Sequence, residues 1–340
     1  MRIEDAIERL VNRRSLREAE ARSVMSQVMA GEATPAQIAA LLVALRMKGE
    51  TGSELTGFAR VMRDNVVPVK TNRQNVIDTC GTGGDTLKTF NISTAAAFVA
   101  AGAGATVSKH GNRAVTSKCG SADVLEALGV SLSLSAEPCG ALLDEIGIAF
   151  LFAPNFHPAM RHAAGPRKEI RLRTVFNLLG PLTNPAGAKR QVLGVFHPTL
   201  VGRLSGVLKR LGAERAAVAH GLAGLDEVSP VGPTRIAFID GKEVEERVLN
   251  PSDFGVPELA PASIAASETA EGNAALLREA LTNPASPYSQ AVLPSAALAL
   301  WVAGMSDDLK QCAQMARESI ESGAAAAKLD ALIERSRALS

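Results

Sequence analysis

Two loops rich in glycine, hydroxyl and basic residues lie close together in the sequence. The first is Gly81-Thr82-Gly83-Gly84-Asp85, and the second runs from Lys109 to Ser117 with the sequence KHGNRAVTS. Glycine lets the backbone approach a ligand closely, and backbone N–H groups and lysine side chains bind anions. No acidic residue lies between Asp85 and Asp123. This pattern predicts a pocket for a highly phosphorylated small molecule.

A short apolar helix is expected between the two loops. Asn91, Ser93 and Thr94 are residue types that open helices, and the apolar run Ala95–Ala101 ends at Gly102. Unpaired N–H groups at the helix start would face the first loop and favour an anion. Alone, the first loop also fits a tight surface turn and the second a solvated basic turn. Two such loops after neighbouring strands favour a diphosphate site. Their sequences match neither the GxGxxG pattern of Rossmann dinucleotide-binding folds nor the GK[ST] pattern of P-loops.

The adjacent carboxyl groups of Asp226 and Glu227 are candidate ligands of a cation. Mg²⁺ prefers carboxylate and phosphate oxygens, and a bound diphosphate needs charge compensation. We therefore expect a metal here, although adjacent acids on a loop are commonly solvated, and these two could instead pair with Arg235 or cap a helix. The five histidines show no metal-ligand spacing. His110 lies in the second loop, where we expect a polar wall for a second substrate rather than an obligatory base.

The beginning of the chain predicts a helical domain over residues 1–70. Its periodicity is helical throughout, and capping boxes are expected at three pairs, Ser15/Glu18, Thr34/Gln37 and Thr51/Glu54. The basic, proline-containing segment at about 157–185 is expected to pack back near this domain. That would place basic residues at a domain cleft, where ligands often bind.

The remainder predicts a larger α/β domain over residues 71–340. Short β-branched runs alternate with helices, which indicates a mainly parallel central sheet covered by helices on both sides. Asp240-Gly241 predicts a hairpin into an antiparallel strand, and the chain reads as helical again from Glu271. The strand candidates are residues 76–80, 105–109, 148–152, 191–196, 216–220 and 234–240.

Composition limits the classes of function. The 340 residues carry a net charge of +1, which gives no global reason to expect nucleic acid or membrane as a partner. Four cysteines without CxxC spacing predict reduced thiols in a cytoplasmic protein. The charged N-terminus and the lack of a long apolar run argue against a signal peptide and a transmembrane helix. Charge is uneven locally, since Glu169 is the only acid between Ile146 and Ala213.

The motifs together resemble the anthranilate phosphoribosyltransferase family of tryptophan biosynthesis. The resemblance covers nearly the whole chain and is carried by GTGGD, TFNIST, KHGNRAVTSKCGSADVLEALGV, FAPNFHPAMRHAAGPRKEIRLRTVFNLLGPLTNPAGAKRQVLGV and GLDEVSPVGPT. It implies transfer of the 5-phosphoribosyl group from 5-phosphoribosyl 1-diphosphate to the amine of anthranilate. It also implies Mg²⁺ as cofactor and a homodimer joined through the helical domain.

The resemblance also implies roles for individual residues. Anthranilate would contact Gly81, Asn112 and Arg167, and the metal would be held by Ser93, Asp226 and Glu227. Thr86 and Cys119 depart from the family's usual glycine and serine, and an asparagine is missing near Pro294. The phosphoribosyl diphosphate would contact Gly81, Gly84, Asp85, Thr89, Asn91, Ser93, Thr94, Lys109, Ser117 and Ser121.

Two other functions are compatible with parts of the pattern. A pyrimidine nucleoside phosphorylase shares the architecture, but the sequences of its glycine loop and its lysine-bearing loop differ from those found here. In such an enzyme Arg167 would lack a carboxylate to bind. A non-enzymatic nucleic-acid-binding relative would use the basic residues between 161 and 210. The intact glycine loop, the lysine loop, the acidic pair and the near-neutral total charge argue against that second alternative.

Overall fold

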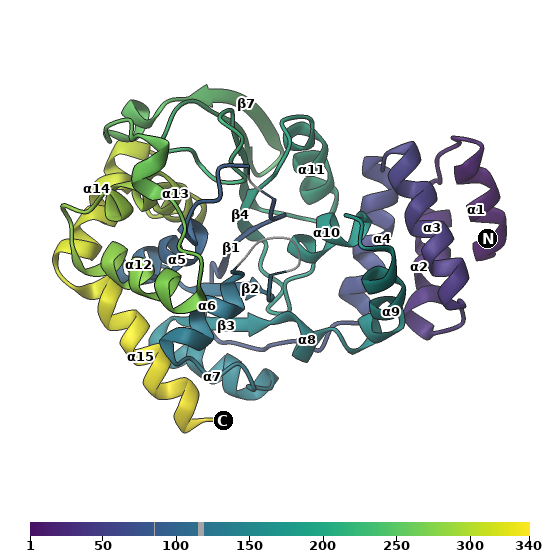
Figure 1. The fold of residues 1–340 in the computed structure, drawn as a ribbon, viewed down its shortest axis with the longest axis horizontal. Coiled ribbons are helices and arrows are strands. Elements are labelled where there is room, and N and C mark those ends of the chain that lie inside the picture. The colour runs from purple at the N-terminus through teal and green to yellow at the C-terminus, as the bar shows by residue number, and fades with distance from the viewer. Residues whose placement is uncertain (85, 115–118) are drawn as a thin grey trace.

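The protein has a helical part at one end and a larger α/β part around a central sheet (Figure 1). The structure is a computed structural model that describes residues 1–84, 86–114 and 119–340. The helical part contains α1 (Ile3–Val11), α2 (Glu18–Ala30), α3 (Pro35–Lys48) and α4 (Gly52–Asp64). None of the described helices has the length and apolar character needed to cross a membrane.

Capping boxes begin two of these helices as predicted. Thr34 N–H donates to Gln37 Oε1 at 2.8 Å at the start of α3, and Thr51 N–H donates to Glu54 Oε2 at 2.7 Å at the start of α4. The box predicted for Ser15 and Glu18 is wrong. Helix α2 begins at Glu18 itself, because the Glu20 carboxylate accepts from the Arg17 N–H at 2.8 Å and so places the cap two residues later.

Among the described residues, seven strands form one sheet in the order β3-β2-β1-β4-β5-β6-β7. The strands β1 to β5 are parallel, and β6 and β7 add an antiparallel hairpin at one edge, as the Asp240-Gly241 turn predicted. The predicted strands are all present within two residues of their expected ends. Their bounds are β1 (Ile77–Gly81), β2 (Val107–Gly111), β3 (Ile148–Phe152), β4 (Arg190–Gly194), β5 (Arg215–Gly221), β6 (Thr234–Asp240) and β7 (Glu243–Leu249).

Both faces of the sheet are buried beneath helices, which confirms the predicted fold class. On one face, Ile77 and Ala217 pack into a core with helices α5 and α13; on the other, Leu193 and Val218 pack with α11 and the helical part. Alternate residues of each strand thus reach different cores. The covering helices are α5 (Ile92–Gly102), α6 (Ser121–Leu128), α7 (Ala136–Ile146), α11 (Thr199–Arg210), α12 (Ala270–Thr282), α13 (Pro287–Ala303), α14 (Leu309–Glu321) and α15 (Ala324–Ala338).

The segment after β3 crosses to the helical part. Ala163 and Val175 belong to the same core as Leu41 and Phe58 of α3 and α4. Figure 1 shows α9 and α10 lying between the sheet and helices α2 to α4. This segment contains α8 (Ala153–Phe156), α9 (Arg161–Ile170), α10 (Val175–Leu179) and the short 3-10 turns Pro158–Met160 and Gly180–Leu182; two more 3-10 turns span Pro251–Phe254 and Pro261–Ile264.

The strand order reverses between β1 and β4. From β1 the chain adds β2 and β3 on one side, whereas β4 and β5 lie on the other. Loops leaving neighbouring strands at such a point run in opposite directions and open a crevice at the carboxyl ends of the strands, where open α/β sheets bind ligands. The glycine loop leaves β1 at this position.

Candidate active site at the carboxyl ends of the strands

The glycine loop is attached to strand β4. Gly81 pairs with Gly194 at the end of β1, and Thr82 N–H donates to the Gly194 carbonyl at 2.9 Å. Thr82 Oγ1 accepts from the Phe196 N–H at 3.1 Å. Gly83 and Gly84 have φ values of +68° and +99°, a region that side chains other than glycine enter at a cost. Asp85 lies outside the described residues.

The helix after this loop begins earlier than the sequence predicted. Asn91 is its N-cap, and its carbonyl accepts from the Thr94 and Ala95 N–H groups, so that Ser93 and Thr94 lie in the first turn of α5. The expectation of a start at Ala95 is wrong because the polar residues themselves take helical geometry. The Asn91 side chain donates to the Cys119 carbonyl at 3.4 Å, which joins the helix start to the end of the second loop. Thr89, in the connecting stretch, forms a bridge with Ala265.

Lys109 lies beneath the glycine loop rather than in open solvent. Its side chain is buried in β2, and Nζ donates to the Thr79 carbonyl. Burial lowers the pKa of Lys109, an effect opposed by the charges of Asp78 and Glu227. Asp78 accepts from the His110 N–H at 3.1 Å, and burial raises its pKa. Lys109 therefore adds positive potential to the floor of the crevice.

The second loop is closed by an acid that the sequence analysis did not single out. Asp123 Oδ2 accepts from the Ala114 N–H at 2.9 Å and from the Gly120 N–H at 2.8 Å. Ser121 begins α6 and donates its hydroxyl to the Asn112 carbonyl at 3.5 Å. An aspartate three residues after Gly120 was the available signal, since this is the capping-box position. Ser117 lies outside the described residues.

The acidic pair lies across the ends of β1 and β4. A Cβ at Gly194 would lie 1.8 Å from the Asp226 carbonyl oxygen, and one at Gly81 would lie 3.2 Å from Asp226 Oδ2. Glu227 Oε1 accepts from the Ser93 N–H at 3.0 Å, which brings two of the three predicted metal ligands together.

The electrostatics of the pair fit a hard divalent cation. Burial, followed by the charge of Asp226, raises the pKa of Glu227 to about 8, and Lys109 offsets this only in part. Two carboxyl groups that disfavour each other's charge are stabilised by a cation between them. Their oxygen donors suit Mg²⁺.

A cavity of about 620 Å³ opens beside the glycine loop and brings together all three residues predicted for anthranilate. Gly81 comes from β1, Asn112 from the second loop and Arg167 from α9. The Arg167 guanidinium lies 5.2 Å from the centre of the Phe176 ring, which orients it. Burial lowers the pKa of Arg167. We call this cavity the acceptor pocket.

His110 lines the acceptor pocket together with His157, which the sequence analysis did not assign. Their Nε2 atoms lie 3.2 Å apart, and both rings are buried. Burial lowers the pKa of His110 to about 3 and that of His157 to about 4. Both rings are therefore neutral near pH 7 and line the cavity. No sequence spacing relates them, because His157 follows a different strand.

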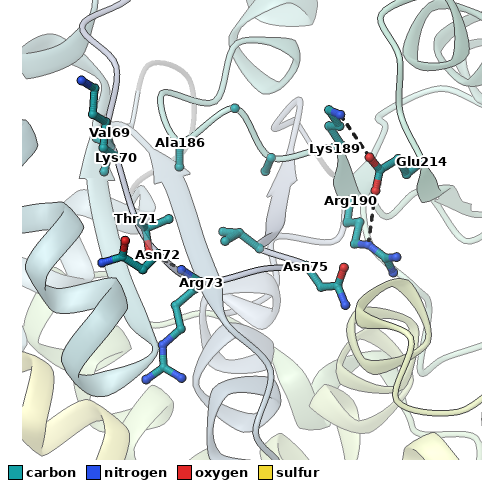
Figure 2. Close-up of a pocket in the computed structure, with 13 residues that line it drawn as sticks. Val69, Lys70, Thr71, Asn72, Arg73, Asn75, Ala186, Lys189, Arg190 and Glu214 are labelled. Atoms are coloured by element: carbon teal, nitrogen blue, oxygen red, sulfur yellow. Dashed lines mark hydrogen bonds and ion pairs between the residues drawn. The ribbon is translucent and has the colours of Figure 1, made fainter.

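A second cavity, of about 590 Å³, lies at the opposite end of the strands (Figure 2). Three of its four basic side chains bind neighbouring protein groups. Lys189 and Arg190 pair with Glu214, and Arg73 donates to the Asp144 carbonyl at 2.6 Å. The second cavity is therefore a weaker candidate for an anion site than the crevice at the carboxyl ends of the strands.

Comparisons with known proteins identify relatives of both parts of the chain. Residues 73–326 match the glycosyl transferase family, a/b domain, and residues 4–66 match the glycosyl transferase family, helical bundle domain. An anthranilate phosphoribosyltransferase of Moorella thermoacetica is 54% identical, covering 96% of this chain and 96% of its own. One of Laribacter hongkongensis is 50% identical, covering 97% of each chain.

Solved structures of anthranilate phosphoribosyltransferases are also similar to this chain. The crystal structure of anthranilate phosphoribosyltransferase from Thermus thermophilus has a TM-score of 0.91 at 43% identity, covering 98% of this chain and 99% of that one. The Saccharomyces cerevisiae enzyme in complex with PRPP and Mg has a TM-score of 0.89 at 26% identity, covering 99% and 98%. With similarity along almost its entire length, the chain belongs to the anthranilate phosphoribosyltransferase family.

Proposed function

We propose that the crevice between the glycine loop and the acceptor pocket is where this chain transfers the 5-phosphoribosyl group to anthranilate. The products are N-(5-phosphoribosyl)anthranilate and diphosphate, in L-tryptophan biosynthesis. One observation carries this assignment to the crevice. Gly81 begins the glycine loop and also lines the acceptor pocket, so the donor and acceptor sites meet at one residue.

The donor, 5-phosphoribosyl 1-diphosphate, is assigned to the glycine loop and the start of α5. The positive end of the helix dipole favours phosphate there. The N–H groups of the first turn already donate to protein acceptors, so the expected unpaired N–H groups are not part of this support. Buried Lys109 adds a charge from below. The residues assigned to the donor are Gly81, Gly84, Asp85, Thr89, Asn91, Ser93, Thr94, Lys109, Ser117 and Ser121.

The cofactor is assigned as Mg²⁺, held by Ser93, Asp226 and Glu227. The raised pKa of Glu227 and its contact with the start of α5 support this position. When bound, Mg²⁺ supplies positive charge that stabilises the departing diphosphate. The Saccharomyces cerevisiae relative in complex with PRPP and Mg supports the same choice.

Anthranilate is assigned to the acceptor pocket. The forked guanidinium of Arg167 can bind its carboxylate with two hydrogen bonds, while Asn112 and the neutral pair His110 and His157 line the rest. An aromatic amine is neutral at pH 7, so no base must remove a proton before attack on ribose C1. Orientation of the amine and stabilisation of the leaving group account for catalysis, and no residue acts as an obligatory acid or base.

The test is loss of anthranilate fluorescence after mixing with 5-phosphoribosyl 1-diphosphate, with and without Mg²⁺. We expect rapid loss that depends on Mg²⁺. Replacing Asp226 by Asn and Glu227 by Gln should lower the rate sharply at limiting Mg²⁺. An undiminished rate in that variant would contradict the metal site. Phosphorolysis of thymidine or uridine in place of this reaction would favour the phosphorylase alternative.

We also propose that the protein is a homodimer joined through its helical part. Its two domains are assigned to residues 1–70 and 71–340, and the segment at 157–185 is assigned a position near the first domain. Support comes from α3, where Ala36, Ala40, Val43 and Met47 follow helical spacing on its outer side; Met47 is 72% exposed. An apolar stripe of this kind on a surface helix suits a self-complementary interface. We assign the protein to the cytoplasm, without nucleic acid or membrane as a partner.

A further inference from the structure

Arg173 connects the glycine loop to the segment that carries Arg167. Its guanidinium donates to the Gly83 carbonyl at 2.6 Å and lies 4.5 Å from the centre of the Phe196 ring. Phe196 in turn donates its N–H to Thr82 of the same loop. A Cβ at Gly84 would lie 1.9 Å from Arg173 Nη2, so the loop and the guanidinium are in close contact.

The bond from Arg173 orients a donor for the diphosphate. The Gly83 carbonyl and the Gly84 N–H belong to one peptide unit, and in a trans peptide these groups point in opposite directions. A carbonyl held by Arg173 therefore turns the Gly84 N–H away from the guanidinium. This N–H is then available to an anion on the other side of the loop, without reorganisation when that anion binds.

The same segment also positions Arg167. The Arg167 carbonyl accepts from the Arg171 N–H at 3.3 Å at the end of α9, where Arg171 adopts a φ of +48°. Two residues later comes Arg173, immediately before the cap of α10. Phe176 of α10 lies beneath Arg167 and is buried. Arg167 therefore packs on α10, and Arg173 immediately precedes the N-cap of the same short, buried helix.

We propose that Arg173 is a positioning residue that couples anthranilate binding to diphosphate binding. A carboxylate on Arg167 restrains α10, and the restrained Arg173 holds the Gly83–Gly84 peptide in the orientation that binds diphosphate. Reciprocity then requires that bound diphosphate tighten anthranilate binding by the same factor. The proposal rests on the proposed function, since it concerns the two subsites of that reaction.

The test is a fluorescence titration of anthranilate, alone and with saturating inorganic diphosphate and Mg²⁺, a mixture that cannot turn over. We expect diphosphate to tighten anthranilate binding at least about fivefold in the wild type, the lower end of typical couplings. Arg173→Gln should bring this factor to about one while changing the Kd for anthranilate alone less than about twofold. Arg173→Lys should also lose coupling, because an ammonium cannot bond Gly83 and stack on Phe196 in the same way.

Lys168→Gln is the matched control, because Lys168 lies on the same segment and is exposed. It should keep the wild-type factor. Circular dichroism and the melting temperature identify which variants are folded. Wild-type coupling in either folded Arg173 variant overturns the proposal. Absence of coupling in a wild type that consumes anthranilate overturns it as well, whereas a wild type without turnover refutes the proposed function instead.

Discussion

At the scale of single residues, burial determines how the charged groups of the site behave. Lys109 and Glu227 both lose hydration, which lowers the pKa of the first and raises that of the second. The charge of each group partly offsets the pKa shift of the other, while the charge of Asp226 raises the pKa of Glu227 further. At the proposed metal site, a bound dication would stabilise the charged forms of both carboxyl groups.

Arg167 gives the most direct test at this scale. Arg167→Ala should weaken anthranilate binding by about 1.5–3 kcal/mol, the range for a hydrogen bond to a charged group. The KM for anthranilate should therefore rise more than tenfold, while the KM for 5-phosphoribosyl 1-diphosphate changes much less. Lys168→Ala should leave both values unchanged. An unaltered anthranilate KM in Arg167→Ala would remove Arg167 from the acceptor site.

The two buried histidines of the acceptor pocket, His110 and His157, predict how stability depends on pH. Their pKa values are about 3 and about 4 in the folded protein, against an ordinary value of 6.5. Below pH 6.5 the unfolded chain takes up protons that the folded rings do not, so stability falls as the pH decreases from 6.5 towards 4. Urea unfolding of the wild type and His157→Gln at pH 7.5 and pH 5.5 should show a smaller loss in the variant. Equal losses would contradict this account.

At the scale of elements, buried charge and capping join the helices of the N-terminal part. Glu54 caps α4, accepts from the Leu16 N–H at 2.9 Å and pairs with Lys48 at 2.9 Å. The side chains of Glu54 and Lys48 are 0% and 6% exposed. One carboxylate therefore links α3, α4 and the turn before α2, and its loss would leave several donors without an acceptor.

Glu54→Ala should be strongly destabilising for this reason. Removing one partner of a buried ion pair costs about 3–5 kcal/mol, because the remaining charge stays buried. Glu18→Ala is the control, since Glu18 pairs with Arg60 at the surface and such a pair contributes at most about 1 kcal/mol. Urea unfolding followed by circular dichroism measures both. Similar losses in the two variants would show that the Glu54 contacts contribute little.

At the scale of the whole molecule, the helical part and one face of the sheet share a core. Phe58 of α4, Val175 of α10 and Leu193 of β4 belong to it. The crevice is therefore bordered by two parts that are packed together through the segment carrying Arg167 and Arg173. Helix α3 belongs to the helical part, which lies at the end of the molecule away from α14 and α15 (Figure 1).

The proposed dimer gives a test at this scale. Met47→Asp places a charge in the apolar stripe of α3 and should shift the protein from dimer to monomer, because an unpaired charge is costly to bury. Met305→Asp is the control, since Met305 is also exposed, at 41%, but follows α13 in the α/β part. Sedimentation velocity distinguishes the two states. A Met47→Asp protein that remains dimeric would place the interface elsewhere.

Much of the site could be predicted from the sequence because its signals are local. The glycine loop, the capping boxes of Thr34 and Thr51 and the alternation of strands and helices depend on residues a few positions apart. The failures were local as well. The capping box predicted for Ser15 and Glu18 does not form because the Glu20 carboxylate accepts from the Arg17 N–H instead. The helix predicted to start at Ala95 starts earlier because Ser93 and Thr94 are themselves helical.

The sequence by itself determined the sheet with its glycine loop and the acidic pair, since backbone conformation responds to neighbouring side chains. Only the tertiary structure decided that His157 reaches His110, that Arg173 holds Gly83 and that Asp226 lies against Gly194. These partners are separated by 32 to 90 residues in the chain and meet because strands and crossover helices bring distant segments to one edge. No local pattern records such a contact.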